Sequence, residues 1–316
     1  MLRYVAFRIW ASLLTLAIVG TLVFSIIHLL PGDPVLILLG EQGASSPEVV
    51  AKIRRQLRLD LPLGSQYYEW VRGVARLEFG VSLQNGVPVL QELRARIPRS
   101  LELILASLVI AAALGLPLGV LGARYSNRSL GWLSSLAAVF SLSMPSFVTG
   151  VILVVTFSLK FQLFPSSGYV APSEDLVGHL LYAILPSLTL GIGFVGVVIR
   201  MTRGGLLDVL GKGYVRTARA KGLPERRVLY RHALTNALIP VITLIGVRAG
   251  NLLGGMVIVE SLFNWPGLST LLVRSCYDRD YPMMQGTLLA IFALFIVISL
   301  AIDLCHATVD PRLREG

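Results

Sequence analysis

Residues 214–234 hold six Lys or Arg side chains against a single acid, Glu225. A compact group of cations binds anions or steers a negatively charged protein surface toward it. Ala218 and Gly222 lie four residues apart, a spacing that predicts a small-residue helix face which another protein can approach closely. The segment therefore indicates a protein docking site, and the alternative is a basic loop bound to anionic lipid headgroups. The cations are Arg216, Arg219, Lys221, Arg226, Arg227 and Arg231.

A phosphate-binding loop is the second chemistry that this region could carry, because glycine precedes lysine at Gly211-Lys212. The motif requires G-x-x-x-x-G-K followed by Ser or Thr. The first glycine position holds Leu206, and the residue after Lys212 is Gly213, which has no hydroxyl for Mg²⁺. The sequence therefore predicts no nucleotide site and no cofactor on this chain.

Catalytic and metal sites are also expected to be absent. The histidines and the two cysteines show no metal-ligand spacing, and no histidine pairs with a serine nucleophile. An intramembrane hydrolase is therefore disfavoured, and we expect no disulfide. The net charge of +10 is better explained by membrane topology and a partner surface than by nucleic acid. These residues are His28, His179, His232, His306, Cys276 and Cys305.

Long apolar runs indicate which class of protein positions the basic segment. A helix needs about 20 apolar residues to cross a bilayer core. We therefore predict an all-α integral membrane protein with six transmembrane helices, which excludes a soluble enzyme. One run, 130–159, exceeds a simple span, and Pro145 in its middle predicts a bend or an interfacial part. The six runs are 9–30, 101–123, 130–159, 180–199, 238–259 and 283–305.

Residues 31–99, between the first two runs, predict a helical extracytoplasmic segment with amphipathic stretches. Tyr67, Tyr68 and Trp70 lie either at the membrane interface or in the core of a small outer subdomain, and both interpretations stay open. The predicted parts are 1–30, the N-terminus and first span; 31–99, the extracytoplasmic segment; 100–306, the core with spans two to six, including the cytoplasmic segment 200–235; and 307–316, a cytoplasmic tail.

Charge predicts the orientation, because cytoplasmic loops are enriched in Lys and Arg. Residues 200–235 are rich in Lys and Arg but contain only two acids, Asp208 and Glu225, so this segment is expected inside. Six alternating spans then place both termini in the cytoplasm. Within the segment, Pro224 disfavours helix at Leu223 and suits the start of a new helix, which predicts a helix, a sharp turn and a second helix.

Several stretches together resemble the permease subunits of binding-protein-dependent ABC importers, in the peptide, opine and nickel branch. The longest is "YVRTARAKGLPERRVLYRHALTNALIPVITLIG", and the others are "LLPGDP", "ILPSLTLG", "FNWPGL", "RDYPMMQG" and "DPRLR". The long outer segment is typical of the first of the two permeases in such a pair. The resemblance implies a type I ABC importer permease fold in a prokaryotic inner membrane, and no ATP hydrolysis on this chain.

The resemblance also implies that the basic segment is a coupling helix, which inserts into a cleft on the ATP-hydrolysing subunit. The family carries Glu-Ala-Ala, three further residues and Gly. Aligned on Gly222, the first position holds Arg216, so the Glu is absent. The implied ATPase-coupling residues are Arg216, Thr217, Ala218, Arg219, Ala220, Lys221, Gly222 and Leu223.

The implied partners are a second homologous permease, two cytoplasmic ATPase subunits that bind ATP and Mg, an extracytoplasmic solute-binding protein and membrane lipid. The chain would form the translocation path for di- or oligopeptides by alternating access, and glutathione, opines, sugars and nickel stay open as solutes. The alternative is an ion-coupled secondary transporter, which would need acids inside the spans.

The fifth apolar run combines a glycine repeat with one charge. Gly246, Gly250 and Gly254 recur every four residues and predict a tightly packed helix face. Arg248 lies about 160–200° around the helix axis from Gly246 and Gly250. It is therefore expected either in the translocation path, where it would attract a carboxylate, or in a polar contact with the second permease.

Overall fold

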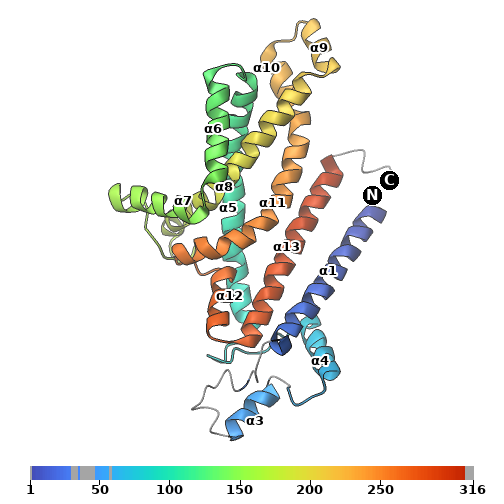
Figure 1. The fold of residues 1–316 in the computed structure, drawn as a ribbon, viewed down its shortest axis with the longest axis vertical. Coiled ribbons are helices and arrows are strands. Elements are labelled where there is room, and N and C mark those ends of the chain that lie inside the picture. Colours follow the sequence, from blue (N-terminus) through green and yellow to red (C-terminus); the bar gives the residue numbers. More distant parts are fainter. Residues whose placement is uncertain (1, 30–34, 36–46, 57–58, 310–316) are drawn as a thin grey trace. The chain divides into compact units, whose positions relative to one another are not determined.

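The computed structural model describes residues 2–29, 35, 47–56 and 59–309. This part of the chain is almost entirely helical, and an isolated bridge between Val81 and Pro88 is its only β pairing (Figure 1). The chain divides into two compact units. Unit 1 comprises residues 1–8, 100–266 and 297–316, and unit 2 comprises residues 9–99 and 267–296.

Unit 1 is built around α8 (Leu176–Leu210), which packs mainly against α6 and α11. Besides α8, this unit contains α5 (Val89–Arg124, from Ser100 onward), α6 (Ser129–Ser143), α7 (Ser146–Leu153), the π-helix η1 (Val154–Lys160), α9 (Gly213–Ala220), α10 (Glu225–Arg227), the π-helix η2 (Val228–Leu234), α11 (Thr235–Leu262) and the end of α13 (Tyr281–Val309).

Small residues set the distance between α5 and α8. A Cβ at Gly115 would lie 2.6 Å from the Cβ of Val198, and a Cβ at Gly119 would lie 2.6 Å from the Cβ of Thr202. Both positions therefore require glycine at this helix separation. Close backbone approach of this kind stabilises helix association inside a bilayer, because apolar lipid leaves little hydrophobic driving force for helices to associate.

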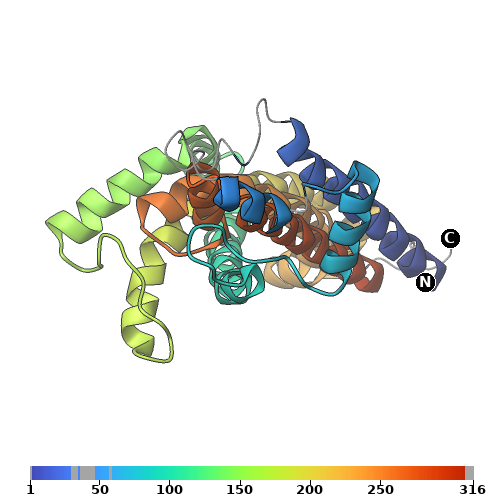
Figure 2. The same cartoon turned by 90° about the horizontal axis from the view of Figure 1, so that it is seen from below.

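A sharp break separates α6 from α7, with the two directions differing by 104° (Figures 1 and 2). Met144 is extended at φ −81° and ψ 122°, and Pro145 follows at φ −60° and ψ 141°. The proline ring clashes with a helical conformation of the residue before it, so the helix ends at Ser143. The bend predicted from Pro145 is confirmed.

Unit 2 packs α4 against the C-terminal part of α1 (Leu2–Leu29). The hydroxyl groups of Tyr67 and Thr21 lie 2.8 Å apart, and the ring of Trp70 lies 5.7 Å from that of Phe24. These contacts leave Tyr67 and Trp70 half-buried against α1, while Tyr68 is 64% exposed. The other elements of this unit are α3 (Pro47–Gln56), α4 (Leu63–Ala75), the start of α5, α12 (Leu268–Tyr277) and the first part of α13.

Four described helices are long and apolar enough to cross a membrane, and the bent pair of α6 with α7 and η1 brings the number to five. The fifth predicted span falls on α11, where the side chains of residues 242–253 lie outside the described part of the chain. The predicted all-α membrane fold is therefore confirmed, and a count of six spans is compatible with it. The four helices are Ala6–Ser25, Val89–Arg124, Leu176–Leu210 and Tyr281–Ala301.

Candidate functional site: the basic helix-turn-helix and the buried polar contacts

The basic segment forms a short helix, a turn and a second helix. Helix α9 ends at Ala220, and Gly222 takes a left-handed conformation at φ +76°. The N–H of Gly222 donates to Arg219 O at 2.9 Å, and the N–H of Leu223 donates to Ala218 O at 3.4 Å. This hydrogen-bond pattern is a Schellman motif, which ends a helix at a glycine. The second helix predicted from Pro224 is confirmed, with Pro224 at its N-cap position and Glu225 as its first residue.

Gly222 therefore lies beyond α9, and it does not share a helix face with Ala218. Ala218 is instead 9% exposed and packs in an apolar cluster with Val215 of its own helix, Leu206 of α8 and Val228 of η2. The face of α9 that remains free for a partner carries other members of the predicted coupling segment. These exposed residues are Arg216, Thr217, Arg219 and Ala220 on α9, followed by Lys221 and Gly222 in the turn.

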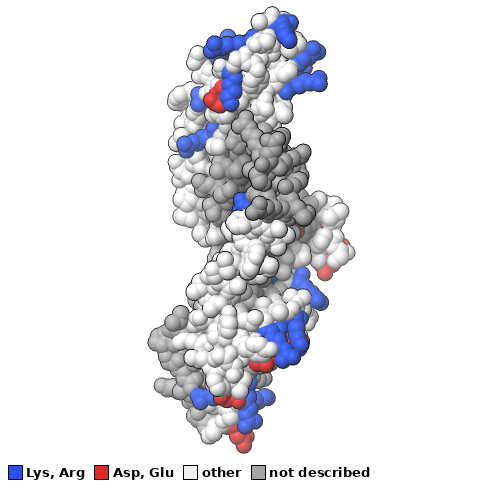
Figure 3. Space-filling view, turned by 90° about the vertical axis from the view of Figure 1, so that its right-hand side faces the viewer, with Lys and Arg blue, Asp and Glu red and all other residues white. Residues whose placement is uncertain are grey.

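The positive charge of the segment is only partly neutralised. Arg219 donates two hydrogen bonds to the carboxylate of Glu225, at 3.1 and 2.7 Å. This pair lowers the pKa of Glu225 and raises the pKa of Arg219. The other cations have no ion pair in the described part of the chain. Figure 3 shows Lys and Arg gathered over α9 and α10, at the end of unit 1 that these helices form.

A buried polar contact in unit 1 joins residues that sequence reasoning had left scattered. His179 Nε2 lies 2.5 Å from Glu102 Oε1, and His179 Nδ1 lies 2.7 Å from Val170 O. The imidazole is 3% exposed, and the rings of Tyr169 and Trp265 lie against it at 5.5 and 5.8 Å. This cluster connects α5, α8, the loop before α8 and the loop after α11.

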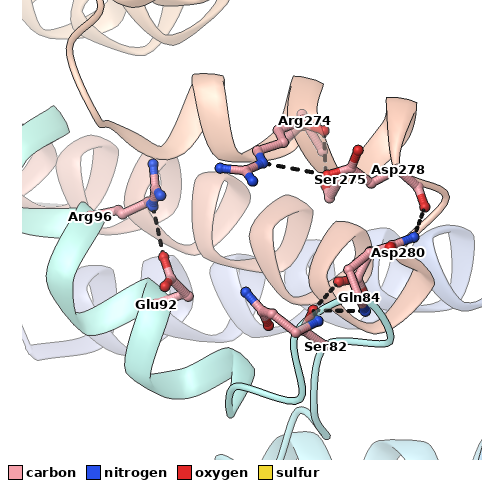
Figure 4. Close-up of polar contacts among 10 residues, drawn as sticks. Ser82, Gln84, Glu92, Arg96, Arg274, Ser275, Asp278 and Asp280 are labelled. Carbon is pink, nitrogen blue, oxygen red and sulfur yellow. Dashed lines mark hydrogen bonds and ion pairs between the residues drawn. The ribbon is translucent and has the colours of Figure 1, made fainter.

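A second polar cluster lies in unit 2, where Asp280 caps α13 (Figure 4). Its Oδ1 accepts from the N–H of Met283 at 3.3 Å and from the N–H of Leu83 at 3.2 Å, and its Oδ2 accepts from the Ser82 hydroxyl. Gln84 Nε2 donates to Asp278 O at 2.6 Å. The aspartate of "RDYPMMQG" therefore ties the turn at 82–85 to the start of the last helix.

The residues expected in the fifth span are described only in part. The side chains of Gly246, Arg248 and Gly250 lie outside the described residues, so their roles stay predictions. Gly254 is described, and a Cβ built on it meets no atom within 4 Å. If Gly254 packs closely, its neighbour is therefore a residue outside the described part or another molecule.

Two family models match this chain, and together they span almost all of it. The model of the binding-protein-dependent transport system inner membrane component matches residues 115–315. The model of the N-terminal part of such membrane components matches residues 1–104. The second match includes α1, α3, α4 and the start of α5.

Full-length relatives come from peptide and glutathione transport systems. The dipeptide transport system permease protein DppB of Escherichia coli K12 is 36% identical over 338 residues, covering 100% of this chain and 99% of that protein. The glutathione transport system permease protein GsiC of the same strain is 40% identical over 314 residues, covering 99% of each.

A solved structure shares the fold at low sequence identity. A chain of the MetNI methionine ABC transporter in an inward-facing conformation superposes with a TM-score of 0.59 and 19% identity, covering 70% of this chain and 97% of that chain. The likeness shows that this chain shares the helical fold of that transporter chain.

Proposed function

We propose a function from one premise: the chain belongs to the family of binding-protein-dependent transport system inner membrane components. It is therefore a membrane permease component of a transport system, and not a catalytic enzyme. An ion-coupled secondary transporter is not favoured, because both family models describe binding-protein-dependent transport systems.

The proposed cargo is a di- or oligopeptide or glutathione. The observation that carries this proposal is the full-length identity of 36% to a dipeptide permease and 40% to a glutathione permease. Both substrates are short, peptide-bonded molecules with a free carboxylate, so a shared path is chemically reasonable. Arg248 on α11 is the candidate residue of this path for attracting that carboxylate.

The proposed coupling element is α9 with its turn, residues 213–223. We propose that its exposed face enters a cleft on a cytoplasmic ATPase subunit, where ATP and Mg would bind. Its inner face supports this role, because Val215 is fully buried against η2 and α8. A packed core is bistable rather than freely deformable, so displacement of α9 would move the bases of α8 and α11 together.

The proposed assembly pairs this chain with a second permease, two ATPase subunits and an extracytoplasmic solute-binding protein. Both termini and α9 would face the cytoplasm, and residues 31–99 would face outward. The spans would then alternate access around a central path, with each cycle driven by closure of the ATPase pair. Gly246, Gly250 and Gly254 would supply a close-packed face of α11 in this assembly.

Uptake in proteoliposomes tests the proposal. The complex is reconstituted with its binding protein, and labelled dipeptide and labelled glutathione are supplied outside, with or without ATP inside. We expect ATP-dependent accumulation of at least one of the two, unaffected by an ionophore that collapses ion gradients. Accumulation that needs an ion gradient and no ATP would reject the coupling, and ATP-driven uptake of neither solute would reject the cargo.

A further inference from the structure

We propose that a hollow next to the coupling helix binds the phosphate headgroup of an anionic phospholipid. The hollow has a volume of about 420 Å³ and lies on α10 and the start of η2, separate from the exposed face of α9. Three guanidinium groups and one phenol surround it. The lining residues are Pro224, Arg226, Arg227, Tyr230 and Arg231.

Helix geometry brings these side chains to one face. Arg226 and Tyr230 lie four residues apart, as do Arg227 and Arg231. Residues 228–234 form a π-helix, whose wider i→i+5 turns bring residues four and five apart onto one side. The opposite side is anchored, because Val228 and Ala233 are fully buried in the apolar cluster beneath α9. The basic face is therefore held in place by the fold.

The hollow has an excess of positive charge. Glu225, the only acid in the segment, is already occupied by Arg219. The side chains of Arg226, Arg227 and Arg231 make no ion pair or hydrogen bond within the described residues. Like charges four residues apart destabilise a helix, and a bound anion relieves that repulsion. A guanidinium presents a planar fork of N–H donors that fits two phosphate oxygens.

Position along the chain favours a lipid over a free anion or an acidic protein surface. η2 continues without a break into α11, whose apolar run begins at Leu238. Arg231 precedes that residue by seven positions, or roughly 10 Å of helix, a distance that corresponds to the headgroup layer beside the hydrocarbon core. Tyr230 is 48% exposed, and amphipathic aromatic side chains collect at this depth.

Lipid retention by the full-length chain tests the site. The chain is purified from nanodiscs of phosphatidylcholine containing a fixed fraction of phosphatidylglycerol, and retained lipids are counted by native mass spectrometry. The test variant is Arg227→Gln with Arg231→Gln. The matched control is Arg124→Gln with Arg128→Gln, which removes the same charge from residues that flank Tyr125 outside the hollow.

We expect the wild type and the control to retain a phosphatidylglycerol that the test variant loses. The affinity of the test variant should fall about thirtyfold, roughly fivefold for each basic residue at a membrane surface. Equal retention by the test variant would overturn the proposal. Displacement of the lipid by inorganic phosphate alone would overturn the proposal in favour of a free anion. If the test variant in the assembled complex lost an ATPase subunit instead of lipid, the proposal would be overturned in favour of a protein surface. None of these results depends on whether the chain transports peptides.

Discussion

The guanidinium of Arg219 and the carboxylate of Glu225 meet across the turn between α9 and α10, with Nη2 and Oε1 2.7 Å apart. This contact bridges the left-handed Gly222 and the Leu223-Pro224 step, where the chain reverses direction. It therefore holds the proposed coupling helix at a fixed angle to the helix that enters the membrane. The pair is largely exposed, and an exposed ion pair contributes at most about 1 kcal/mol to folding stability. Its main effect is therefore to orient the two helices.

Replacement of Glu225 by Gln should increase the mobility of α9 in a pH-dependent way. The hydrogen bond from Arg219 lowers the pKa of Glu225 below its ordinary value of 4.5. A group with a lowered folded pKa stabilises the fold above the ordinary value and loses that effect as the pH falls through the lowered one. A spin label at Lys221→Cys should report higher mobility at pH 7 in the protein that also carries Glu225→Gln than in the labelled protein that retains Glu225.

That mobility difference should vanish well below pH 4.5, where the wild-type carboxylate is protonated and is therefore uncharged, like Gln. Asp208→Gln is the control. It removes another ion pair, with Lys212 at 3.3 Å, whose two residues both precede α9 and do not bridge the turn after it. A mobility difference that persists unchanged at low pH would show that the pair does not hold the turn.

Gly222 should tolerate Asn but not Val. Its φ of +76° lies in the left-handed region, which costs an ordinary residue about 1–2 kcal/mol and disfavours β-branched side chains most. No neighbouring atom lies within 4 Å of a Cβ built there, so the effect is one of backbone conformation. Gly222→Val should weaken both the turn and solute-stimulated ATP hydrolysis, whereas Gly222→Asn should retain both. Identical hydrolysis by the two variants would contradict this account.

Loss of the imidazole at His179 should destabilise unit 1 by about 1–3 kcal/mol, because Glu102 and the carbonyl of Val170 would lose buried hydrogen-bond partners. Thermal unfolding of purified His179→Phe measures the effect. His232→Phe is the control, since its ring makes no hydrogen bond within the described residues. Equal unfolding temperatures for the two variants would show that the buried cluster does not stabilise the fold.

Asp280→Ala should destabilise the start of α13 by about 0.5–2 kcal/mol, the usual cost of losing an N-cap. Ser82 and the N–H of Leu83 would also lose their acceptor. Hydrogen exchange at residues 282–285 measures the local effect. Asp278→Ala, which removes an exposed pair with Arg274, should leave exchange there nearly unchanged. Equal exchange in both variants would remove Asp280 from the capping role.

Features that depend on neighbouring residues were predictable from the sequence. Long apolar runs indicated the membrane helices, Pro145 indicated the break after α6, and Pro224 indicated the turn after α9. Each follows from a local property, namely length against bilayer thickness or the backbone preference of proline and the residue before it. Local chemistry therefore fixed the element types and several of their ends.

Features that depend on distant contacts were not predictable. His179 and Glu102 lie 77 residues apart, and Ser82 and Asp280 lie 198 apart, so spacing alone could not pair them. The prediction that Ala218 shares an exposed face with Gly222 was also wrong, because the burial of Val215 turns this side of α9 toward α8 and η2. A helix of eight residues is too short for its own periodicity to decide which face is covered.

The most direct test of the coupling assignment is ATP-driven uptake by the reconstituted complex carrying Ala220→Trp. Ala220 ends α9 on its exposed face, so the indole would obstruct docking without entering the apolar core. Overpacking a close contact costs about 1–3 kcal/mol, so uptake and solute-stimulated ATP hydrolysis should both fall roughly tenfold or more, while Ala220→Ser stays near wild type. Uptake by Ala220→Trp at the wild-type rate would contradict the assignment of residues 213–223 as the coupling segment.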